Sequence, residues 1–223
     1  MPEAQVRAMF DRIAWVYDRM NSVMTAGLHH RWRERAADLA RVRPGSRALD
    51  VATGTGDLAI ELARRGASVT GIDFAPAMLG VARAKAPWIS FQRGDALALP
   101  YGDAEFDAVT VGFGARNFAD LDRGLREMVR VTRPGGRVVV LEITTPEKPP
   151  LSWFFKAWFD HAVPVLGRLA ADPEAYVYLP SSVRRFPGPE ELAARMEAAG
   201  LEDLRWILTA GGIIALHGGT RRP

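Results

Sequence analysis

The stretch from Arg47 to Ala59, RALDVATGTGDLA, restricts the fold of this chain more than any other. It begins with a short apolar segment, passes through a turn that contains Gly54 and Gly56, and continues as the first turn of a helical pattern. Glycine allows the backbone to turn tightly and lets a ligand approach it closely. A strand that runs into a helix through such a turn is typical of a cofactor site at the carboxyl edge of a parallel sheet.

Asp73 distinguishes a cofactor site from a tight turn that binds nothing. It ends the next apolar run, residues 69–72. A carboxylate at this distance from the glycine turn can accept hydrogen bonds from both ribose hydroxyls of a nucleoside. The turn also fits a dinucleotide fingerprint, because Ala59 can replace the third glycine of that motif.

The order of apolar segments along the chain predicts an α/β fold. We expect strands at 47–51, 68–72, 88–92, 106–111 and 137–143, separated by helices that include 57–65, 76–86 and 121–131. This alternation predicts a doubly wound sheet that is mostly parallel. After a helix at 189–200, the runs 205–208 and 213–217 flank a glycine turn and predict an antiparallel C-terminal hairpin, which gives seven strands.

Two segments lie outside this repeat. Residues 4–19 and 28–41 have helical periodicity with a break at Asn21-Ser22, and the region 1–43 either caps a sheet edge or forms a lid over the cofactor. Residues 144–187 form an insert with an expected helix over 151–170 that covers the acceptor. Its aromatic residues belong either to a core or dimer interface or to a lipid-binding surface: Trp153, Phe154, Phe155, Trp158 and Phe159.

The composition excludes several classes of protein. The 223 residues suit one domain, and the net charge of +3 comes from scattered charges without a basic run, so no nucleic-acid partner is predicted. The absence of cysteine excludes disulfides and thiolate metal sites, and no metal is predicted. No secretory signal and no run of about 18 apolar residues occurs, so we expect a cytoplasmic protein, with peripheral contact at the inner face of the membrane left open.

The motifs that follow the strands resemble those of class I S-adenosylmethionine-dependent methyltransferases. That family has an acidic residue in its first strand, here Asp50, and later motifs similar to Gly94-Asp95-Ala96 and Arg133-Pro134-Gly135-Gly136. The chain departs from the family where Ala52 replaces the first glycine of the turn, a change that should still allow the turn. The resemblance implies S-adenosylmethionine as cofactor and S-adenosylhomocysteine as product.

Within this superfamily the chain is similar over nearly its full length to the demethylmenaquinone and 2-polyprenyl-1,4-benzoquinol C-methyltransferases. The most specific match is Phe113-Gly114-Ala115-Arg116-Asn117, after the fourth strand. The resemblance implies methylation of a ring carbon of a polyprenyl quinol, first of all demethylmenaquinol to menaquinol, with the benzoquinol step of ubiquinone synthesis also open. A homodimer is a further expectation.

The resemblance assigns cofactor binding to the carboxyl edge of the sheet. Gly54 and Gly56 would lie against the methionine moiety, Asp73 would bind the ribose, and Asp95 would accept the adenine amine unless it only closes a turn. Asp50 would orient either the loop or the methionine ammonium. The complete set is Asp50, Gly54, Thr55, Gly56, Asp73, Phe74, Asp95, Ala96 and Gly112.

We expect the catalytic residues to be Arg116, Asn117 and Tyr17. Carbon methylation requires the ring carbon at about 3–3.5 Å from the methyl group and a quinol hydroxyl that loses its proton. Arginine is too basic to accept that proton, so Arg116 would stabilise the developing phenolate unless it and Asn117 tether their loop. His217 is either a base or a structural histidine.

Two other functions remain open from the residues alone. The glycine turn also suits an NAD-dependent oxidoreductase, although the chain has no Tyr-x-x-x-Lys pair. The second is a non-catalytic protein of the same fold, a subunit of a quinone-synthesis complex. Binding of S-adenosylhomocysteine or NAD would distinguish these functions from a methyltransferase.

Overall fold

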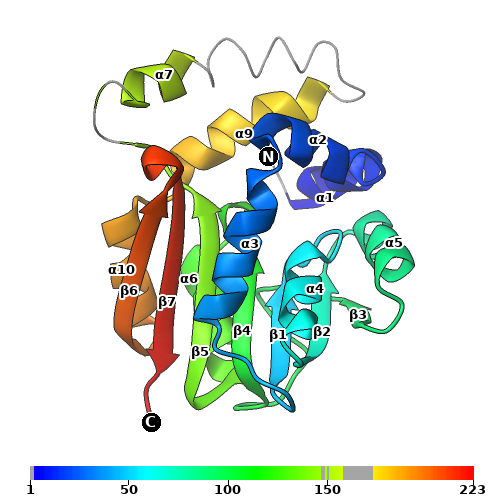
Figure 1. Ribbon diagram of the computed structural model, residues 1–223, viewed down its shortest axis with the longest axis vertical. Helices are drawn as coiled ribbons and strands as arrows, with labels where there is room; N and C mark the ends of the chain where they lie inside the picture. The colour runs from blue at the N-terminus through cyan, green and yellow to red at the C-terminus, as the bar shows by residue number, and fades with distance from the viewer. Residues whose placement is uncertain (1–2, 147–148, 150, 158–172) are drawn as a thin grey trace.

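Figure 1 shows the computed structural model, which describes residues 3–146, 149, 151–157 and 173–223. In these residues the strands form one sheet in the order β3-β2-β1-β4-β5-β7-β6. The strands are β1 (Arg47–Val51), β2 (Ser68–Asp73), β3 (Ser90–Arg93), β4 (Phe106–Gly112), β5 (Thr132–Ile143), β6 (Leu201–Thr209) and β7 (Ile214–Arg221). The α-helices are α1 (Glu3–Ile13), α2 (Tyr17–Thr25), α3 (Leu28–Leu39), α4 (Asp57–Arg64), α5 (Pro76–Lys85), α6 (Leu121–Val131), α7 (Leu151–Ala157), α9 (Pro173–Arg185) and α10 (Pro189–Ala198), with short 3-10 helices η1 (Ala115–Asn117) and η3 (Ala210–Gly212).

The strand pairing confirms the predicted fold class, a doubly wound α/β sheet with an antiparallel C-terminal hairpin. Strands β3, β2, β1, β4 and β5 pair in parallel, and β7 runs antiparallel to both β5 and β6. The last strand therefore enters between β5 and β6 and leaves β6 at the edge. The strand order reverses between β1 and β4, and in such sheets a crevice opens at the carboxyl ends of these two strands.

Helices cover both faces of the sheet, as Figure 1 shows. On one face Val139 and Leu141 of β5 pack in a cluster with α3, α4 and α5. On the other, Val138 and Val140 pack with α6 and α10. Because both faces are buried, successive side chains of the central strands are apolar, which is the pattern that the sequence shows.

Two strands differ in length from the prediction. β3 begins at Ser90, and Trp88 before it is exposed. β5 begins at Thr132 rather than 137, so it includes Pro134 and Gly135, and its pairing with β4 shifts register in this region. A proline can enter a strand at such an irregularity because it has no amide hydrogen to contribute to the ladder.

The prediction of one helix over 4–19 with a break at Asn21-Ser22 was wrong. The break lies at 14–16, between α1 and α2, and α2 continues through Asn21 and Ser22. Ser22 is compatible with the helix because its hydroxyl donates to the carbonyl of Asp18 one turn earlier, at 2.9 Å.

The N-terminal region 1–43 divides into two parts with different positions. α3 packs on a face of the sheet through Trp32, Ala36 and Ala37. α1 and α2 instead lie above the carboxyl edge (Figure 1). Of the predicted lid, only these two helices are therefore placed to cover the crevice, and we call them the lid helices.

The insert 144–187 contributes α9 to the same edge. α9 packs beside α1, and its Tyr178 joins a cluster with Met9 and Ile13 of α1 and Met78 of α5. The predicted helix over 151–170 is represented by α7; residues 158–172, with Trp158 and Phe159, and the side chain of Phe154 lie outside the described residues. No helix in the described part of the chain is both long and apolar enough to cross a membrane.

Candidate active site

A cleft opens at the carboxyl ends of β1, β2, β3 and β4. The loops that follow these four strands line it, so residues far apart in the sequence meet there. We call it the cofactor cleft, because eight of the nine predicted cofactor residues line it: Asp50, Gly54, Thr55, Asp73, Phe74, Asp95, Ala96 and Gly112.

Asp73 holds the glycine turn from the end of β2. Its Oδ2 accepts the amide of Gly54 at 2.8 Å, and its Oδ1 accepts the amide of Ala75 at 2.9 Å. Burial raises the pKa of Asp73 to about 6, against the effect of these backbone hydrogen bonds. A carboxylate has about four acceptor positions, so Asp73 can hold the turn and still accept two hydroxyl groups.

Asp50 is fixed by two threonine hydroxyls. Thr53 Oγ1 donates to one carboxylate oxygen at 2.6 Å, and Thr110 Oγ1 donates to the other at 2.7 Å. Burial raises the pKa of Asp50 to about 6. Because Thr53 belongs to the glycine turn, Asp50 orients that loop, which is one of the two roles expected for it.

The two glycines of the turn have different environments. Gly54 has a φ of +55°, and no atom lies within 4 Å of the position that a Cβ would take. Gly56 has a φ of +84°, but a Cβ there would lie 2.9 Å from the ring of Phe91 and 3.2 Å from Ala82. Gly56 does not line the cleft, and its lack of a side chain allows close packing behind the turn, so its expected contact with the ligand stays a prediction.

Thr55 binds the lid rather than facing the cleft with its hydroxyl. Its Oγ1 donates to Oδ1 of Asp18 in α2 at 2.6 Å. The other oxygen of Asp18 accepts from Lys85 of α5 at 2.7 Å, and Lys85 also donates to Asp57. Asp18 therefore fastens α2 to both the glycine turn and α5, and only the backbone of Thr55 remains for the predicted ligand contact.

Asp95 and Gly112 also line the cofactor cleft. Asp95 is exposed, and its Oδ1 accepts the amide of Leu97 at 2.8 Å in a turn. Its other oxygen has no hydrogen-bond partner among the described residues. At Gly112 a Cβ would lie 3.1 Å from Leu58, so this position meets a ligand only through its backbone.

A second cavity of about 430 Å³ lies beside the cofactor cleft, between the lid helices, α3 and α9. This volume is typical of small-molecule sites. We call it the apolar cavity because most of its residues are apolar, among them Met9, Ile13, Met20, Met24, Trp32, Phe155 and Ile213.

Four residues line both cavities: Phe10, Tyr17, Arg33 and Phe113. Phe113 has a φ of +60°, which is strained for a residue with a side chain. The Arg33 guanidinium lies 5.3 Å from the centre of its ring, and Trp32 meets that ring edge-on at 6.3 Å. The predicted catalytic Tyr17 is therefore at the border of the two cavities.

Arg116 lines the apolar cavity from η1. Its Nη1 donates to Oε1 of Glu142 at 2.6 Å and to the carbonyl of Phe113 at 2.5 Å. Burial lowers the pKa of Arg116, but the Glu142 carboxylate together with Tyr17 and Tyr178 more than offsets burial, so the pKa is raised. The positive charge is thus balanced by a buried carboxylate, and Arg116 does tether its loop; its Nε has no partner in the described residues.

Asn117 lines the cofactor cleft from the same short helix. Its Oδ1 accepts the hydroxyl of Tyr178 in α9 at 3.0 Å. Burial raises the pKa of Tyr178, so this hydroxyl stays protonated and donating. η1 therefore joins the cofactor cleft, the apolar cavity and α9.

Sequence reasoning missed three buried or partly buried charged residues here: Asp18, Arg33 and Glu142. Glu142 could have been found, because it interrupts the otherwise apolar end of β5, and a carboxylate in such a strand needs a cationic partner. Asp18 and Arg33 lie inside the predicted N-terminal helices, whose periodicity does not indicate which elements they meet.

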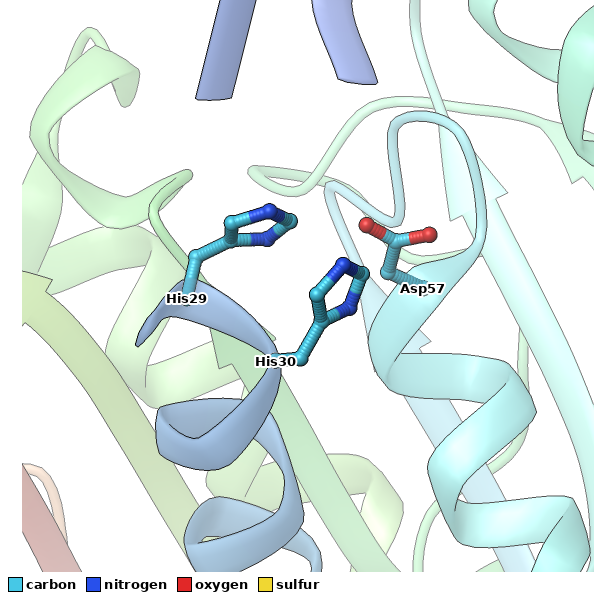
Figure 2. A group of neighbouring side chains, drawn as sticks. All are labelled: His29, His30 and Asp57. Carbon is cyan, nitrogen blue, oxygen red and sulfur yellow. The ribbon is translucent and has the colours of Figure 1, made fainter. Parts of the chain in front are cut away.

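Figure 2 shows that His29 and His30 of α3 approach Asp57 at the start of α4. Their nitrogen and oxygen atoms lie within 4.8 Å of one another, a separation that would suit a metal ion. However, cations already approach this group: Lys85 donates to one oxygen of Asp57, and Arg33 lies 3.5 Å from the other. We therefore describe it as an ion-pair network.

His29 is neutral and has a defined tautomer in this network. Arg33 Nη1 can only donate, so the hydrogen bond between them makes His29 Nδ1 the acceptor. The Nε2 hydrogen then points to Ser22 Oγ at 3.1 Å. Burial and then the charge of Arg33 lower the pKa of His29 to about 4.

His217 lies in neither cavity. Its Nε2 contacts the carbonyl of Pro189 at 2.8 Å, and its ring stacks on Trp206. Burial lowers its pKa. The structural interpretation of His217 is therefore the one that fits.

The chain matches a known protein family over nearly its whole length. Residues 1–221 match the model of the ubiE/COQ5 methyltransferase family. The chain is 48% identical to demethylmenaquinone methyltransferase of Thermus thermophilus, over 96% of this chain and 100% of the relative. It is 48% identical to the enzyme of the same name from Deinococcus radiodurans, over 92% and 88% of the two chains.

A solved structure supports the fold. A chain in the complex between the Haloferax volcanii Trm112 methyltransferase activator and a methyltransferase aligns with a TM-score of 0.71 at 20% identity, covering 96% of this chain and 98% of that one. The oxidoreductase and the non-catalytic interpretations are thus set aside. The chain belongs to the ubiE/COQ5 methyltransferase family and is an S-adenosylmethionine-dependent methyltransferase.

Proposed function

We propose that this enzyme methylates a ring carbon of demethylmenaquinol at the border between the cofactor cleft and the apolar cavity. One observation carries the proposal: the two cavities share a wall made of Phe10, Tyr17, Arg33 and Phe113. A polar cofactor and an apolar acceptor can therefore meet at one place. The names of the relatives from Thermus thermophilus and Deinococcus radiodurans favour the naphthoquinol over the benzoquinol.

The cofactor cleft has groups that suit S-adenosylmethionine. Asp73 keeps two acceptor positions for ribose hydroxyls, and the free oxygen of Asp95 suits an exocyclic amine beside Ala96. The amides at the start of α4 suit a carboxylate, and Gly54 leaves space beside them. Phe74 and the backbone of Gly112 complete the cradle.

The bound cofactor supplies an electrophilic methyl group. The net reaction exchanges one hydrogen of the quinol ring for that methyl group and releases one proton. Negative charge collects on the quinol oxygen when its hydroxyl loses a proton, and it moves into the ring as the new carbon–carbon bond forms. The protein therefore assists by stabilising the phenolate and by excluding water.

Tyr17, Arg116 and Asn117 are proposed to act on the acceptor. Tyr17 lines both cavities and can donate a hydrogen bond to the quinol oxygen. Arg116 lines the apolar cavity and positions Phe113 through its carbonyl. Asn117, held by Tyr178, positions the loop on the cofactor side.

The test uses the purified enzyme with two reduced acceptors of equal prenyl length, a demethylmenaquinol and a 2-polyprenyl-1,4-benzoquinol. We expect the naphthoquinol to be methylated with the higher kcat/KM. Methylation of neither quinol, despite binding of S-adenosylhomocysteine, would contradict the proposal. A preference for the benzoquinol would reassign the enzyme to ubiquinone synthesis.

We further propose a cytoplasmic enzyme that meets its acceptor at the membrane surface. Val23 lines the apolar cavity and is also 79% exposed, so the cavity opens near α2. Trp15 beside α2 and Trp153 of α7 are exposed as well. Exposed aromatic and aliphatic side chains on these segments suit contact with a bilayer that holds the prenyl tail. The homodimer stays a prediction.

A further inference from the structure

Arg33 is a cation at the border of the two cavities, and the function as described so far does not use it. It comes from α3, is 5% exposed and lines both the cofactor cleft and the apolar cavity. Its charge also lowers the pKa of Asp50 in β1, which shows how near it lies to the glycine turn.

Only one nitrogen of Arg33 is engaged by the protein. Nη1 meets Nδ1 and the carbonyl of His29, and lies 3.5 Å from Asp57. Nε and Nη2 have no hydrogen bond to any described residue. Neither nitrogen is among the buried polar atoms of the described residues that lack a partner, so both are reached from the cavities and can donate to a group bound there.

Arg33 differs in this respect from Arg116. Arg116 is hydrogen-bonded to its own carboxylate, Glu142, at 2.6 Å. Asp57 lies farther from Arg33 and is shared with Lys85. A nearby carboxylate therefore neutralises less of the positive charge of Arg33 than of Arg116, which leaves more of the Arg33 charge to act on a ligand in the apolar cavity.

Building on the proposed quinol methylation, we propose that Arg33 binds the quinol oxygen together with Tyr17 and stabilises the phenolate that forms when the hydroxyl loses its proton before methyl transfer. His29 is its positioning residue, because its neutral ring holds Nη1 and leaves Nε and Nη2 free. The group that accepts hydrogen bonds from Nε and Nη2 is an aromatic hydroxyl or its anion. The proton of the hydroxyl leaves to water, since arginine cannot accept it.

The first experiment compares wild type with Arg33→Gln and Arg33→Lys under anaerobic conditions, with demethylmenaquinol as acceptor. We expect Arg33→Gln to lower kcat about 10²-fold, the usual effect of removing a charge stabiliser, while the Kd of S-adenosylhomocysteine stays unchanged. Arg33→Lys keeps the charge and should recover part of kcat. Arg35→Gln, an exposed arginine of the same helix outside both cavities, is the matched control and should behave as wild type.

A pH profile separates this role from a structural one. The charged and titratable groups around Arg33 are His29 and His30 on its own helix, Asp57 with Lys85 and Asp18 behind it, Asp50, and Tyr17 and Arg116, which line the same cavity. Loss of a phenolate stabiliser should move the ascending limb of kcat, which follows ionisation of the bound quinol, to higher pH. A fall in kcat that leaves this limb in place and is equal in both variants would overturn the proposal.

The second experiment does not depend on activity. 2-Naphthol is titrated by absorbance in the presence of enzyme and S-adenosylhomocysteine. We expect the wild type to lower the pKa of the bound naphthol relative to the free compound, and Arg33→Gln to remove that shift. If the naphthol binds and the shift survives in Arg33→Gln, the role of Arg33 is wrong while the proposed function stands. If wild type binds no naphthol, the apolar cavity is not the acceptor site and both fail.

Discussion

The cofactor cleft and the apolar cavity meet at one wall but are built differently. The cofactor cleft consists of loops that each follow a strand of the central sheet, and its polar groups are held by short hydrogen bonds from neighbouring backbone and threonines. The apolar cavity is assembled from α1, α2, α3, η1, α7 and α9, and its charged groups are held by ion pairs between elements. The sheet therefore determines the first site, and tertiary packing determines the second.

The sharpest test of this difference is Asp73→Ala. It removes the proposed ribose acceptor and the acceptor for the Gly54 and Ala75 amides. We expect the affinity for S-adenosylhomocysteine to fall by about 10²-fold or more, from several lost charge-assisted hydrogen bonds. Isothermal titration measures the Kd, and circular dichroism checks the fold. Asp95→Ala, at the exposed end of the cleft, should weaken binding less; an unchanged Kd for Asp73→Ala would contradict the placement.

On the other side of the wall, Arg116→Ala should act first on stability. It leaves the Glu142 carboxylate buried without its partner, and breaking such a pair costs about 3–5 kcal/mol. Denaturant unfolding measures this cost. The double variant Arg116→Gln with Glu142→Gln should recover most of the stability but not the activity. Equal stability of Arg116→Ala and wild type would show that the pair is not buried as described.

The cofactor side should also respond to pH. The pKa of Asp50 is about 6 when folded, above the ordinary value near 3.8, so its contribution to stability is complete below pH 3.8 and is lost as the pH rises through 6. Asp50→Asn should therefore increase the free energy of unfolding more at pH 7.5 than at pH 4.5, with a difference on the order of 1–3 kcal/mol. Urea unfolding at both pH values measures it. If the substitution changes the free energy of unfolding equally at pH 4.5 and pH 7.5, the pKa of Asp50 is not raised by folding.

Substitutions of the exposed apolar side chains near α2 and α7 are expected to have a smaller effect, on membrane binding. We expect salt-sensitive co-sedimentation of the enzyme with anionic liposomes, reduced by the double change Val23→Ser and Trp153→Ser, because both side chains are exposed. Trp88→Ser is a matched control, since Trp88 is equally exposed but lies between α5 and β3. Failure of the wild type to bind liposomes at low salt would refute the membrane contact.

The smallest effect is expected at Ala52, which replaces the first glycine of the family's turn. Ala52 has a φ of +50°, a conformation that costs a residue with a Cβ about 1 kcal/mol more than glycine. Ala52→Gly should therefore raise the unfolding free energy by about 0.5–1 kcal/mol. A loss of stability instead would mean that the Ala52 methyl group, which packs against Gly114, contributes more than the strain costs.

The sequence alone determined the features that depend on local order. The alternation of apolar runs predicted the mostly parallel sheet, and the glycine turn with Asp73 predicted the cofactor cleft, because residues at the carboxyl ends of parallel strands always meet at one edge. Asp50, Asp95 and Gly112 were assigned from the resemblance to the methyltransferase family, and each lies within or just after such a strand.

Only the tertiary structure decided how the helices close the site. The pairing of Arg116 with Glu142, the bond between Asp18 and Thr55, and the free donors of Arg33 join elements that are distant in sequence. Periodicity tells which face of a helix is apolar but not which element it meets, so it left open whether the N-terminal helices cap a sheet edge or form a lid. It also placed the break between the first two helices wrongly. The position of Gly56 behind the turn likewise depends on Phe91, which reaches it only because β3 and α5 pack there.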